Sequence, residues 1–297
     1  MSLVIPNSAS AGNFEHFTAG SLMGFRDFYL YNVPSGHPAG LVVMLHGCKT
    51  DASEFNEGTE MSKYAVEKNL AVLYPEQSVL ANMDRCWNWF WGTENTIIAE
   101  GVRQVQERFH LNRDHTYLMG MSAGAAQAAI MANCNRDLFS GVLIHSGLQY
   151  LAAENIDDAQ TSLQNGSYTT AIDAAKRALE CESNNKPVRF MVVYGTADLR
   201  VNPINGKQAA DEMLKLNELL AHKSHAPAVV TTTDKDVAAT APLLSYHEQD
   251  LFIDGALTGT VLEVNGLAHE WSGGNPIQPR NNPNGPNVIE LFFQKFL

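Results

Sequence analysis

The chain has few basic residues and no long apolar run. It carries 20 lysines and arginines against 32 aspartates and glutamates in 297 residues, a formal charge of −12 at pH 7. Because an acidic surface repels phosphate backbones and no basic segment offsets it, nucleic acid is not expected as a partner. No stretch approaches the roughly 18 uninterrupted apolar residues of a spanning helix, so membrane insertion is not expected either.

Signal-peptide features and cysteine clusters are also missing. The first residues, MSLVIPNSASAG, lack the basic and long apolar regions of a signal peptide. The cysteines match no close-spaced metal-binding pattern and permit three full pairings. They are Cys48, Cys86, Cys134 and Cys181. No metal and no cofactor are expected. Buried free thiols and disulfides both remain open, and a disulfide would favour export to a periplasmic or extracellular compartment.

Short apolar runs recur along the chain and predict buried strands. They are LVVML from Leu41, LAVLY from Leu70, TYLMG from Thr116, GVLIH from Gly141 and RFMVVYG from Arg189. Segments with apolar residues three and four apart follow the first three runs, at residues 53–69, 94–109 and 123–134, and predict helices. Because alternating strands and helices form parallel crossovers, the predicted architecture is α/β, with a doubly wound, mostly parallel sheet.

The two ends of the chain complete the predicted sheet. RDFYLYNV, residues 26–33, is separated from LVVML by PSGHPAG and predicts an antiparallel hairpin at the sheet edge. PAVVTTT, SYHEQDLFID and GTVLEVNG predict later strands, and GPNVIELFFQKFL predicts a closing helix. We expect an N-terminal extension over residues 1–20 and a single catalytic domain over residues 21–297. Residues 152–181 carry two helical patterns and form either an ordinary crossover or a small cap over a pocket.

The stretch YLMGMSAGAAQAAIMAN, residues 117–133, holds the candidate nucleophile. It runs from a predicted strand through a Gly-x-Ser-x-Gly string into an alanine-rich predicted helix. The string alone is a weak signal, but a strand, elbow and helix in this order present a serine at the carboxyl end of a sheet. Gly120 and Gly124 remove side chains that would collide where strand and helix meet. Ser122 is therefore the predicted nucleophile.

A serine hydroxyl needs a base to accept its proton and a carboxylate to orient that base. His269, in NGLAHEWSGG, follows the last predicted strand and precedes the closing helix. Asp198 lies in the loop after the fifth core strand, and the order Ser122, Asp198, His269 is the one this kind of sheet uses. Asp198 could instead start a surface turn or cap the helix after Pro203, in which case Glu248 and Asp250 are the reserve acids.

A loop after the first core strand supplies the predicted oxyanion site. The elbow offers the backbone N–H of Ala123, and the sequence His46-Gly47-Cys48 would aim the N–H of Cys48 at the same point. We expect His46 to fix this loop rather than to act as a second base. A rival interpretation makes Cys48 a thiol nucleophile, but no strand-elbow context surrounds it.

The segment DRCWNWFWG, residues 84–92, places three tryptophans after the second core strand. They form either a substrate-facing wall or a packed scaffold, because dense aromatics suit both. Trp87 and Trp89, together with Trp271 beside the predicted base, are the candidate pocket residues. A disulfide between Cys48 and Cys86 would tie this segment to the oxyanion loop, since both cysteines lie in predicted active-site loops.

Together these motifs resemble the polyhydroxybutyrate depolymerase family of serine esterases, whose relatives act on feruloyl and acetyl esters of plant polysaccharides. The resemblance runs from about residue 25 to the end, and its most distinctive pair is HGC with RCWNWF. It implies an α/β-hydrolase fold, with Ser122, Asp198 and His269 as the triad and the amides of Cys48 and Ala123 as the oxyanion hole. GLAHEW and NCNRDLF depart from the family pattern, which bears on the substrate more than on the chemistry.

The predicted function is hydrolysis of 3-hydroxybutyrate-type oligomers, or of other short-chain carboxylic esters, through an acyl-enzyme. Soluble oligomers are favoured over crystalline polymer, because the family's secreted polymer degraders often add a substrate-binding domain that this chain does not carry. The alternatives are a carbohydrate esterase of the feruloyl or acetyl xylan type and a non-catalytic binding protein on the same fold. The sequence predicts no oligomeric state.

Overall fold

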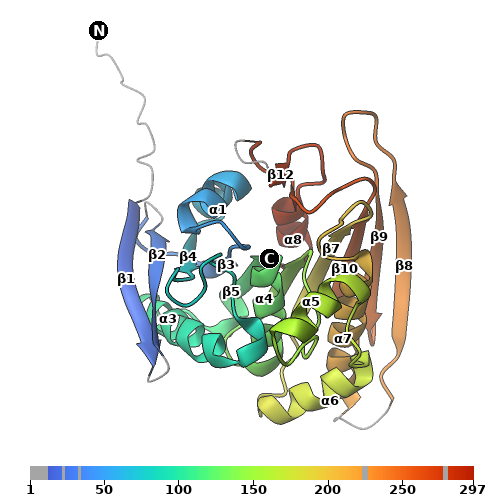
Figure 1. Cartoon of the computed structure of the whole chain (residues 1–297), viewed down its shortest axis with the longest axis horizontal. Helices are drawn as coiled ribbons and strands as arrows, with labels where there is room; N and C mark the ends of the chain where they lie inside the picture. Colours follow the sequence, from blue (N-terminus) through green and yellow to red (C-terminus); the bar gives the residue numbers. More distant parts are fainter. Residues whose placement is uncertain (1–12, 22–23, 33–34, 223–226, 277–279) are drawn as a thin grey trace.

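One ten-stranded sheet runs through the computed structural model, which describes residues 13–21, 24–32, 35–222, 227–276 and 280–297 (Figure 1). Its order is β1-β2-β4-β3-β5-β6-β7-β10-β9-β8. The strands are β1 (Asn13–Ser21), β2 (Gly24–Asn32), β3 (Gly40–Leu45), β4 (Leu70–Glu76), β5 (Thr116–Met121), β6 (Gly141–His145), β7 (Arg189–Gly195), β8 (Val230–Val237), β9 (Tyr246–Ile253) and β10 (Ala256–Val264). The five core runs and the three later ones all form strands, as predicted.

The centre of the sheet is parallel and its two edges are antiparallel. β4, β3, β5, β6, β7 and β10 pair in parallel, whereas β1, β2, β9 and β8 pair antiparallel with their neighbours. Crossover helices link the parallel strands, as this pairing requires. The predicted mostly parallel, doubly wound architecture is confirmed.

One predicted pairing is wrong. The segment that contains β2 does not form a hairpin with β3; β2 pairs antiparallel with β1 on one side and with β4 on the other. β3 is buried on both faces and lies between β4 and β5, as continuously apolar strands do in parallel sheets. Because β1 belongs to the sheet, the sheet starts before the predicted boundary at residue 21. Residues 1–12 of the predicted extension lie outside the described residues.

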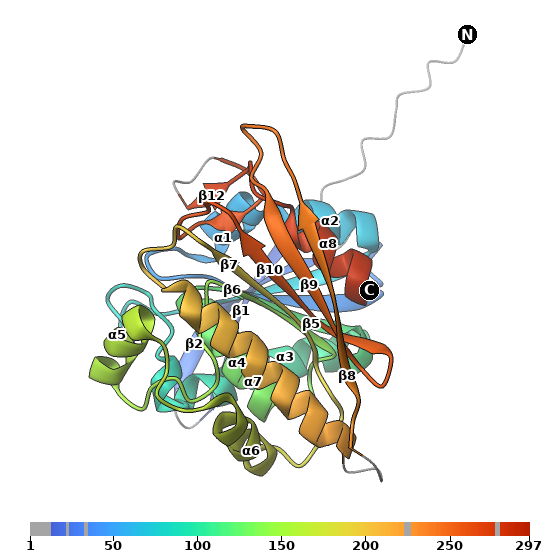
Figure 2. The ribbon, with the colours of Figure 1, turned by 90° about the vertical axis from the view of Figure 1, so that its right-hand side faces the viewer.

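Helices cover both faces of the sheet (Figure 2). They are α1 (Ala52–Thr59), α2 (Met61–Lys68), α3 (Thr93–Phe109), α4 (Ala123–Cys134), α5 (Ile156–Asn165), α6 (Ala171–Cys181), α7 (Pro203–His222) and α8 (Val288–Phe296), with short 3-10 helices at Trp89–Trp91 and Arg113–His115. Leu41, Val43 and Leu45 of β3 point to the face covered by α3, α4 and α7. Val42 and Met44 point to the opposite face, under α1, α2 and α8, as strand alternation requires.

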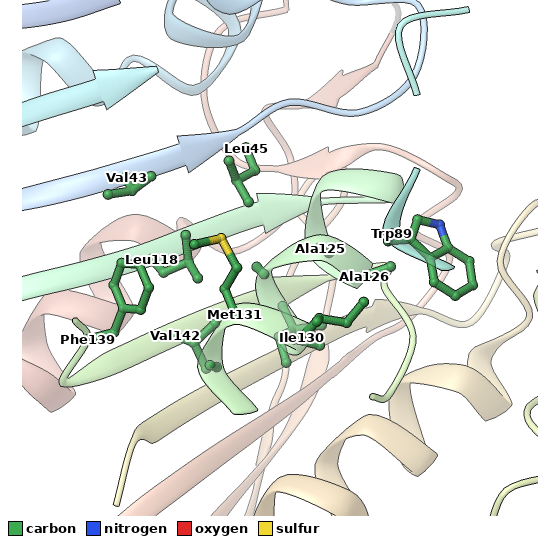
Figure 3. Packing of buried hydrophobic residues seen from close by; sticks show 14 of the residues in the cluster. Val43, Leu45, Trp89, Leu118, Ala125, Ala126, Ile130, Met131, Phe139 and Val142 are labelled. Atoms are coloured by element: carbon green, nitrogen blue, oxygen red, sulfur yellow. The ribbon is translucent and has the colours of Figure 1, made fainter. Parts of the chain in front are cut away.

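The α4 helix is surrounded by protein. All of its residues from Ala123 to Asn133 are buried, and most of them are alanine or glycine. Ala125, Ala126 and Met131 pack against side chains of the central strands (Figure 3). Small side chains let the helix lie close to the sheet, which fixes the position of its first turn and of the serine before it.

The segment predicted as a crossover or a cap contains α5 and α6. A disulfide from Cys134 to Cys181 joins the ends of α4 and α6, and α6 also packs against α7 (Figure 2). The α6 helix therefore belongs to the helical layer, as an ordinary crossover helix does. The α5 helix is tied to the loop after β7, because the N–H of Asn202 donates to the Leu163 oxygen at 2.8 Å. Within the described ranges, no helix is long and apolar enough to cross a membrane.

Candidate active site

Ser122 lies in a sharp turn between β5 and α4. Its backbone has φ 57° and ψ −123°, a conformation that non-glycine residues adopt only where the surroundings enforce it. Its N–H donates to the oxygen of His145 at 2.9 Å, and its own oxygen accepts from the N–H groups of Ala125 and Ala126. These contacts hold the serine in place at the carboxyl edge of the sheet.

The two glycines of the elbow are required by close backbone contacts. A Cβ atom on Gly120 would lie 2.3 Å from the oxygen of Gly124, and one on Gly124 would lie 2.2 Å from the oxygen of Leu45. Both distances are far shorter than any van der Waals contact, so neither position accepts a side chain without moving the backbone. The Gly-x-Ser-x-Gly spacing is thus explained by how tightly α4 is set against β5 and β3.

The structure brings together the three residues predicted as a triad. His269 Nε2 lies 2.9 Å from Ser122 Oγ, and His269 Nδ1 lies 2.8 Å from Asp198 Oδ2. A carboxylate can only accept, so Nδ1 carries the proton and Nε2 is free to accept the serine proton. These side chains come from three separate loops at one edge of the sheet, and they form one continuous hydrogen-bonded chain.

Asp198 is held as an ionised carboxylate. It is buried, and its Oδ1 accepts from the N–H groups of Arg200 and Val201, both at 2.9 Å. Burial alone would raise the pKa of Asp198, but the hydrogen bonds from His269, Val201 and Arg200 outweigh it and lower the pKa. The second oxygen therefore presents a fixed negative charge to the imidazole.

The reserve acids lie elsewhere. Glu248 and Asp250 are on β9, where both accept from Lys295 Nζ, at 2.8 and 2.5 Å. Asp250 also accepts from the hydroxyl of Thr260. Neither is hydrogen-bonded to His269, whose Nδ1 is occupied by Asp198. The geometry leaves Asp198 as the partner of this histidine.

The loop after β3 lies directly against the serine. A Cβ atom on Gly47 would be 3.5 Å from Ser122 Cβ. The Gly47 oxygen accepts from His46 Nδ1 at 2.7 Å and from Thr50 Oγ1 at 2.8 Å, which fixes the peptide whose N–H belongs to Cys48. In the described ranges, the N–H groups of Cys48 and Ala123 have no protein acceptor. Two free donors beside a serine can stabilise a developing oxyanion.

His46 fixes the oxyanion loop, in agreement with the sequence interpretation. It is fully buried, with Nδ1 donating to Gly47 and Nε2 accepting the N–H of Gln77 at 3.1 Å. Burial lowers the pKa of His46 to about 4, so the ring is neutral near pH 7. The indole N–H of Trp87 donates to the His46 oxygen at 3.0 Å and so also holds this loop in place.

A disulfide joins Cys48 to Cys86. It ties the oxyanion loop to the tryptophan segment, and the N–H of Lys49 adds a hydrogen bond to the Asp84 oxygen at 2.6 Å. Arg280 Nη1 donates to the Cys48 oxygen from the other side. The structure therefore contains the predicted bridge. It contradicts both the free-thiol alternative and the Cys48 nucleophile, since all four cysteines are in disulfides.

Comparison with known proteins identifies the family. Residues 27–236, more than half of the chain, match the family described as "Esterase PHB depolymerase". The chain belongs to this family.

Curated relatives of this esterase-family chain include two classes of ester hydrolase. It is 28% identical over 193 residues to poly(3-hydroxyalkanoate) depolymerase C of Paucimonas lemoignei, a match that covers 61% of the chain and 46% of the relative. It is 26% identical over 218 residues to acetylxylan esterase A of Talaromyces purpureogenus, covering 64% and 56%. The chain thus spans about half the length of the curated relatives it matches.

A solved acetyl xylan esterase from Aspergillus awamori superposes with a TM-score of 0.68 and 17% identity, over 87% of this chain and 94% of that one. At this identity the likeness concerns the fold alone. It shows that the esterase-family chain has the α/β-hydrolase fold expected from its sequence.

The tryptophans assigned to the pocket are in fact scaffold. Trp87, Trp89 and Trp271 are 0%, 6% and 1% exposed. Trp89 packs edge-on against Phe90 and lies beside α4 (Figure 3), and Trp271 stacks on His145 at 5.0 Å. Of the two alternatives for the tryptophan segment, Trp87 and Trp89 fit the packed scaffold. The choice of these three tryptophans as pocket residues is wrong because their indole rings are buried.

Three exposed apolar side chains, which the sequence analysis did not identify, lie on loops of this site. Leu80 and Met83 are 96% and 93% exposed, in the loop that leads to Cys86, and Leu199 is 88% exposed directly after Asp198. Cys86 is bridged to Cys48 and Asp198 is hydrogen-bonded to His269, so both loops belong to the candidate site. The available signal was an apolar residue in a polar, turn-rich segment, which periodicity does not detect.

Proposed function

We propose that the chain is a serine esterase. Ser122 Oγ attacks the ester carbonyl, His269 Nε2 accepts the serine proton, and Asp198 holds the imidazole in the required tautomer. The observation that carries this proposal is the hydrogen-bonded chain from Ser122 through His269 to Asp198, at 2.9 and 2.8 Å. The imidazolium then gives its proton to the leaving alkoxide, which departs as an alcohol and leaves an acyl-enzyme.

Water completes the reaction through the same groups. His269 removes a proton from the attacking water, and the acid product leaves as the proton returns to Ser122 Oγ. In both halves the carbonyl oxygen becomes negative, and the N–H groups of Cys48 and Ala123 are the donors that would meet it. The hydrogen bonds on the Gly47 oxygen support this role, because they hold the Cys48 amide in one orientation.

The proposed substrates are esters of 3-hydroxybutyrate type, as short soluble oligomers, or other short-chain carboxylic esters. Similarity to a poly(3-hydroxyalkanoate) depolymerase supports this class. The exposed Leu80, Met83 and Leu199 offer apolar contacts to an aliphatic acyl chain. Trp87, Trp89 and Trp271 are buried and cannot stack on a sugar ring, so these three side chains give no support to a carbohydrate ester.

A carbohydrate ester remains the second candidate. Similarity to an acetylxylan esterase favours it, at nearly the same identity as the depolymerase. The chemistry would be the same, and both the acyl group and the alcohol of the ester would differ. We therefore rank the two by which class of ester the purified protein hydrolyses fastest.

The test is a comparison of substrates with one control variant. Hydrolysis of 3-hydroxybutyrate dimers and trimers is measured beside p-nitrophenyl esters from acetate to octanoate, acetylated xylo-oligosaccharides and methyl ferulate. We expect the hydroxybutyrate oligomers to give the highest kcat/KM, and Ser122→Ala to lose roughly 10⁴ to 10⁶ in kcat. Fast hydrolysis of acetylated xylo-oligosaccharides or methyl ferulate, without hydrolysis of the hydroxybutyrate oligomers, would favour the carbohydrate-ester candidate. No serine-dependent turnover of any ester would favour a binding protein instead.

We also propose that the protein works in an oxidising compartment, periplasmic or extracellular. The support is that the structure pairs Cys48 with Cys86 and Cys134 with Cys181. Such pairs persist outside the reducing cytosol. Thiol titration of the denatured protein after export and after cytosolic expression checks this, with free thiols expected only in the second sample.

A further inference from the structure

His145 is a buried histidine that the proposed chemistry does not use. It is the last residue of β6, it is fully buried, and it pairs with Met121 in the parallel ladder of β5 and β6. Its main-chain oxygen accepts the N–H of Ser122 at 2.9 Å. That contact holds the backbone of the nucleophile, and any residue at this position could make it.

The imidazole of His145 makes a second contact that few side chains could make. Its Nε2 lies 3.0 Å from the main-chain nitrogen of Ser272, and its Nδ1 lies 3.2 Å from Ser146 Oγ. A backbone N–H can only donate, so Nε2 is the acceptor and Nδ1 carries the ring proton. The side chain thus holds the chain three residues after His269.

The same imidazole ring also contacts Trp271, which lies between His269 and Ser272 in the sequence. Trp271 stacks on His145 with centroids 5.0 Å apart and planes at 23°, and its indole meets Phe55 edge-on at 5.5 Å. The N–H of Trp271 donates to the Arg280 oxygen at 2.6 Å. The loop of His269 is therefore anchored to β6 by a stacked ring and a hydrogen bond on consecutive residues.

The electrostatics suit a neutral anchor. Burial, together with the nearby His269, lowers the pKa of His145 to about 3, and Asp198 opposes this shift only in part. The His145 ring is therefore uncharged near neutral pH. An uncharged ring does not repel the imidazolium that forms on His269 during the reaction.

We propose that His145 is a positioning residue: it fixes the loop of His269 against the strand end that holds Ser122, and so sets the distance between base and nucleophile. This rests on the proposed serine mechanism. Its backbone touches one reacting residue and its side chain holds the loop of the other, so one strand end fixes the relative position of both. A base at the wrong distance leaves substrate binding intact and slows proton transfer, so the effect falls on kcat rather than on KM.

The test compares His145→Leu, which keeps bulk but has no acceptor, with His145→Gln, whose amide oxygen can reach the Ser272 N–H. We expect His145→Leu to lose about 10- to 100-fold in kcat with KM within about twofold of wild type. His145→Gln should recover most of that loss. The low-field NMR resonance of the His269 proton bound to Asp198 should shift or broaden in His145→Leu and persist in His145→Gln.

Phe296→Leu, a cavity variant on the buried face of α8, controls for lost stability. It should keep the wild-type kcat at a comparable loss of Tm. Wild-type kcat and NMR signal in His145→Leu would overturn the inference, as would a His145→Gln variant no better than His145→Leu. If His145→Leu does not fold, His145→Asn, too short to reach Ser272, replaces it with the same expectation. Near-normal turnover in Ser122→Ala would instead overturn the proposed function.

Discussion

Glu212 should make the stability of this protein fall as pH rises. It lies on α7, is fully buried, and accepts a 3.3 Å hydrogen bond from Asn133 Nδ2 of α4. Among the described residues its Oε1 has no hydrogen-bond partner, and neither does Asn133 Oδ1. Burial raises the pKa of Glu212 from the usual 4.5 to about 8, although Asn133, the backbone of Tyr150 and the charge of Arg136 oppose it. The folded protein therefore keeps this carboxyl protonated near pH 7.

The sign and size of the effect follow from this difference in pKa. Below pH 4.5 the carboxyl is protonated in both the folded and the unfolded chain, so it causes no pH dependence. Between pH 4.5 and about 8 the unfolded chain loses its proton first, which lowers the free energy of unfolding. At about 1.4 kcal/mol per pKa unit, the full loss above pH 8 is about 5 kcal/mol.

Glu212→Gln removes the titration and keeps the shape of the neutral acid. Urea unfolding between pH 5 and pH 9, with disulfides intact, should show the variant gaining on wild type as pH rises, with little difference at pH 5. The same substitution at the exposed Glu67 on α2 is the matched control and should track wild type throughout. If Glu212→Gln and wild type lose stability in parallel from pH 5 to pH 9, the reasoning is refuted.

The two disulfides should separate stability from catalysis. Replacing Cys48 and Cys86 by serine should lower the free energy of unfolding by about 4 kcal/mol, from a sequence separation of 38, and should also reduce kcat by releasing the oxyanion loop. Replacing Cys134 and Cys181, 47 residues apart, should cost a similar amount in urea unfolding but leave kcat unchanged; equal kcat in both double variants contradicts this. Gly124→Ala should abolish ester hydrolysis, because its Cβ would lie 2.2 Å from a backbone oxygen, and a fully active variant would show that α4 can shift.

The parallel core could be predicted because each strand is coded locally. Runs such as LVVML are apolar on both faces, and the structure buries every residue of β3. Turn chemistry was equally local: the glycines around Ser122 are needed by contacts within a few residues and with the end of the neighbouring strand. The order of Ser122, Asp198 and His269 then placed three distant residues at one sheet edge, where the structure finds them hydrogen-bonded.

Features that depend on which strands become neighbours were beyond local patterns. β2 could pair with the next strand in sequence or with β4, and the alternation of its side chains fits either. The pairing of Cys134 with Cys181 depends on α6 lying beside α4, which no spacing rule encodes. Composition also could not show that the indole N–H of Trp87 would find a buried acceptor at His46, so the sequence leaves both a pocket position and a scaffold position open for this ring.

Labelling with a fluorophosphonate tests the serine mechanism most directly, because the reagent reacts with a serine only when a base activates it. The protein is treated with one equivalent, residual esterase activity is followed, and the modified peptide is mapped by mass spectrometry beside Ser122→Ala. We expect a single adduct on Ser122, loss of activity in proportion to labelling, and no adduct in the variant. An adduct on another serine, or esterase activity that survives complete labelling of Ser122, would contradict the proposed mechanism.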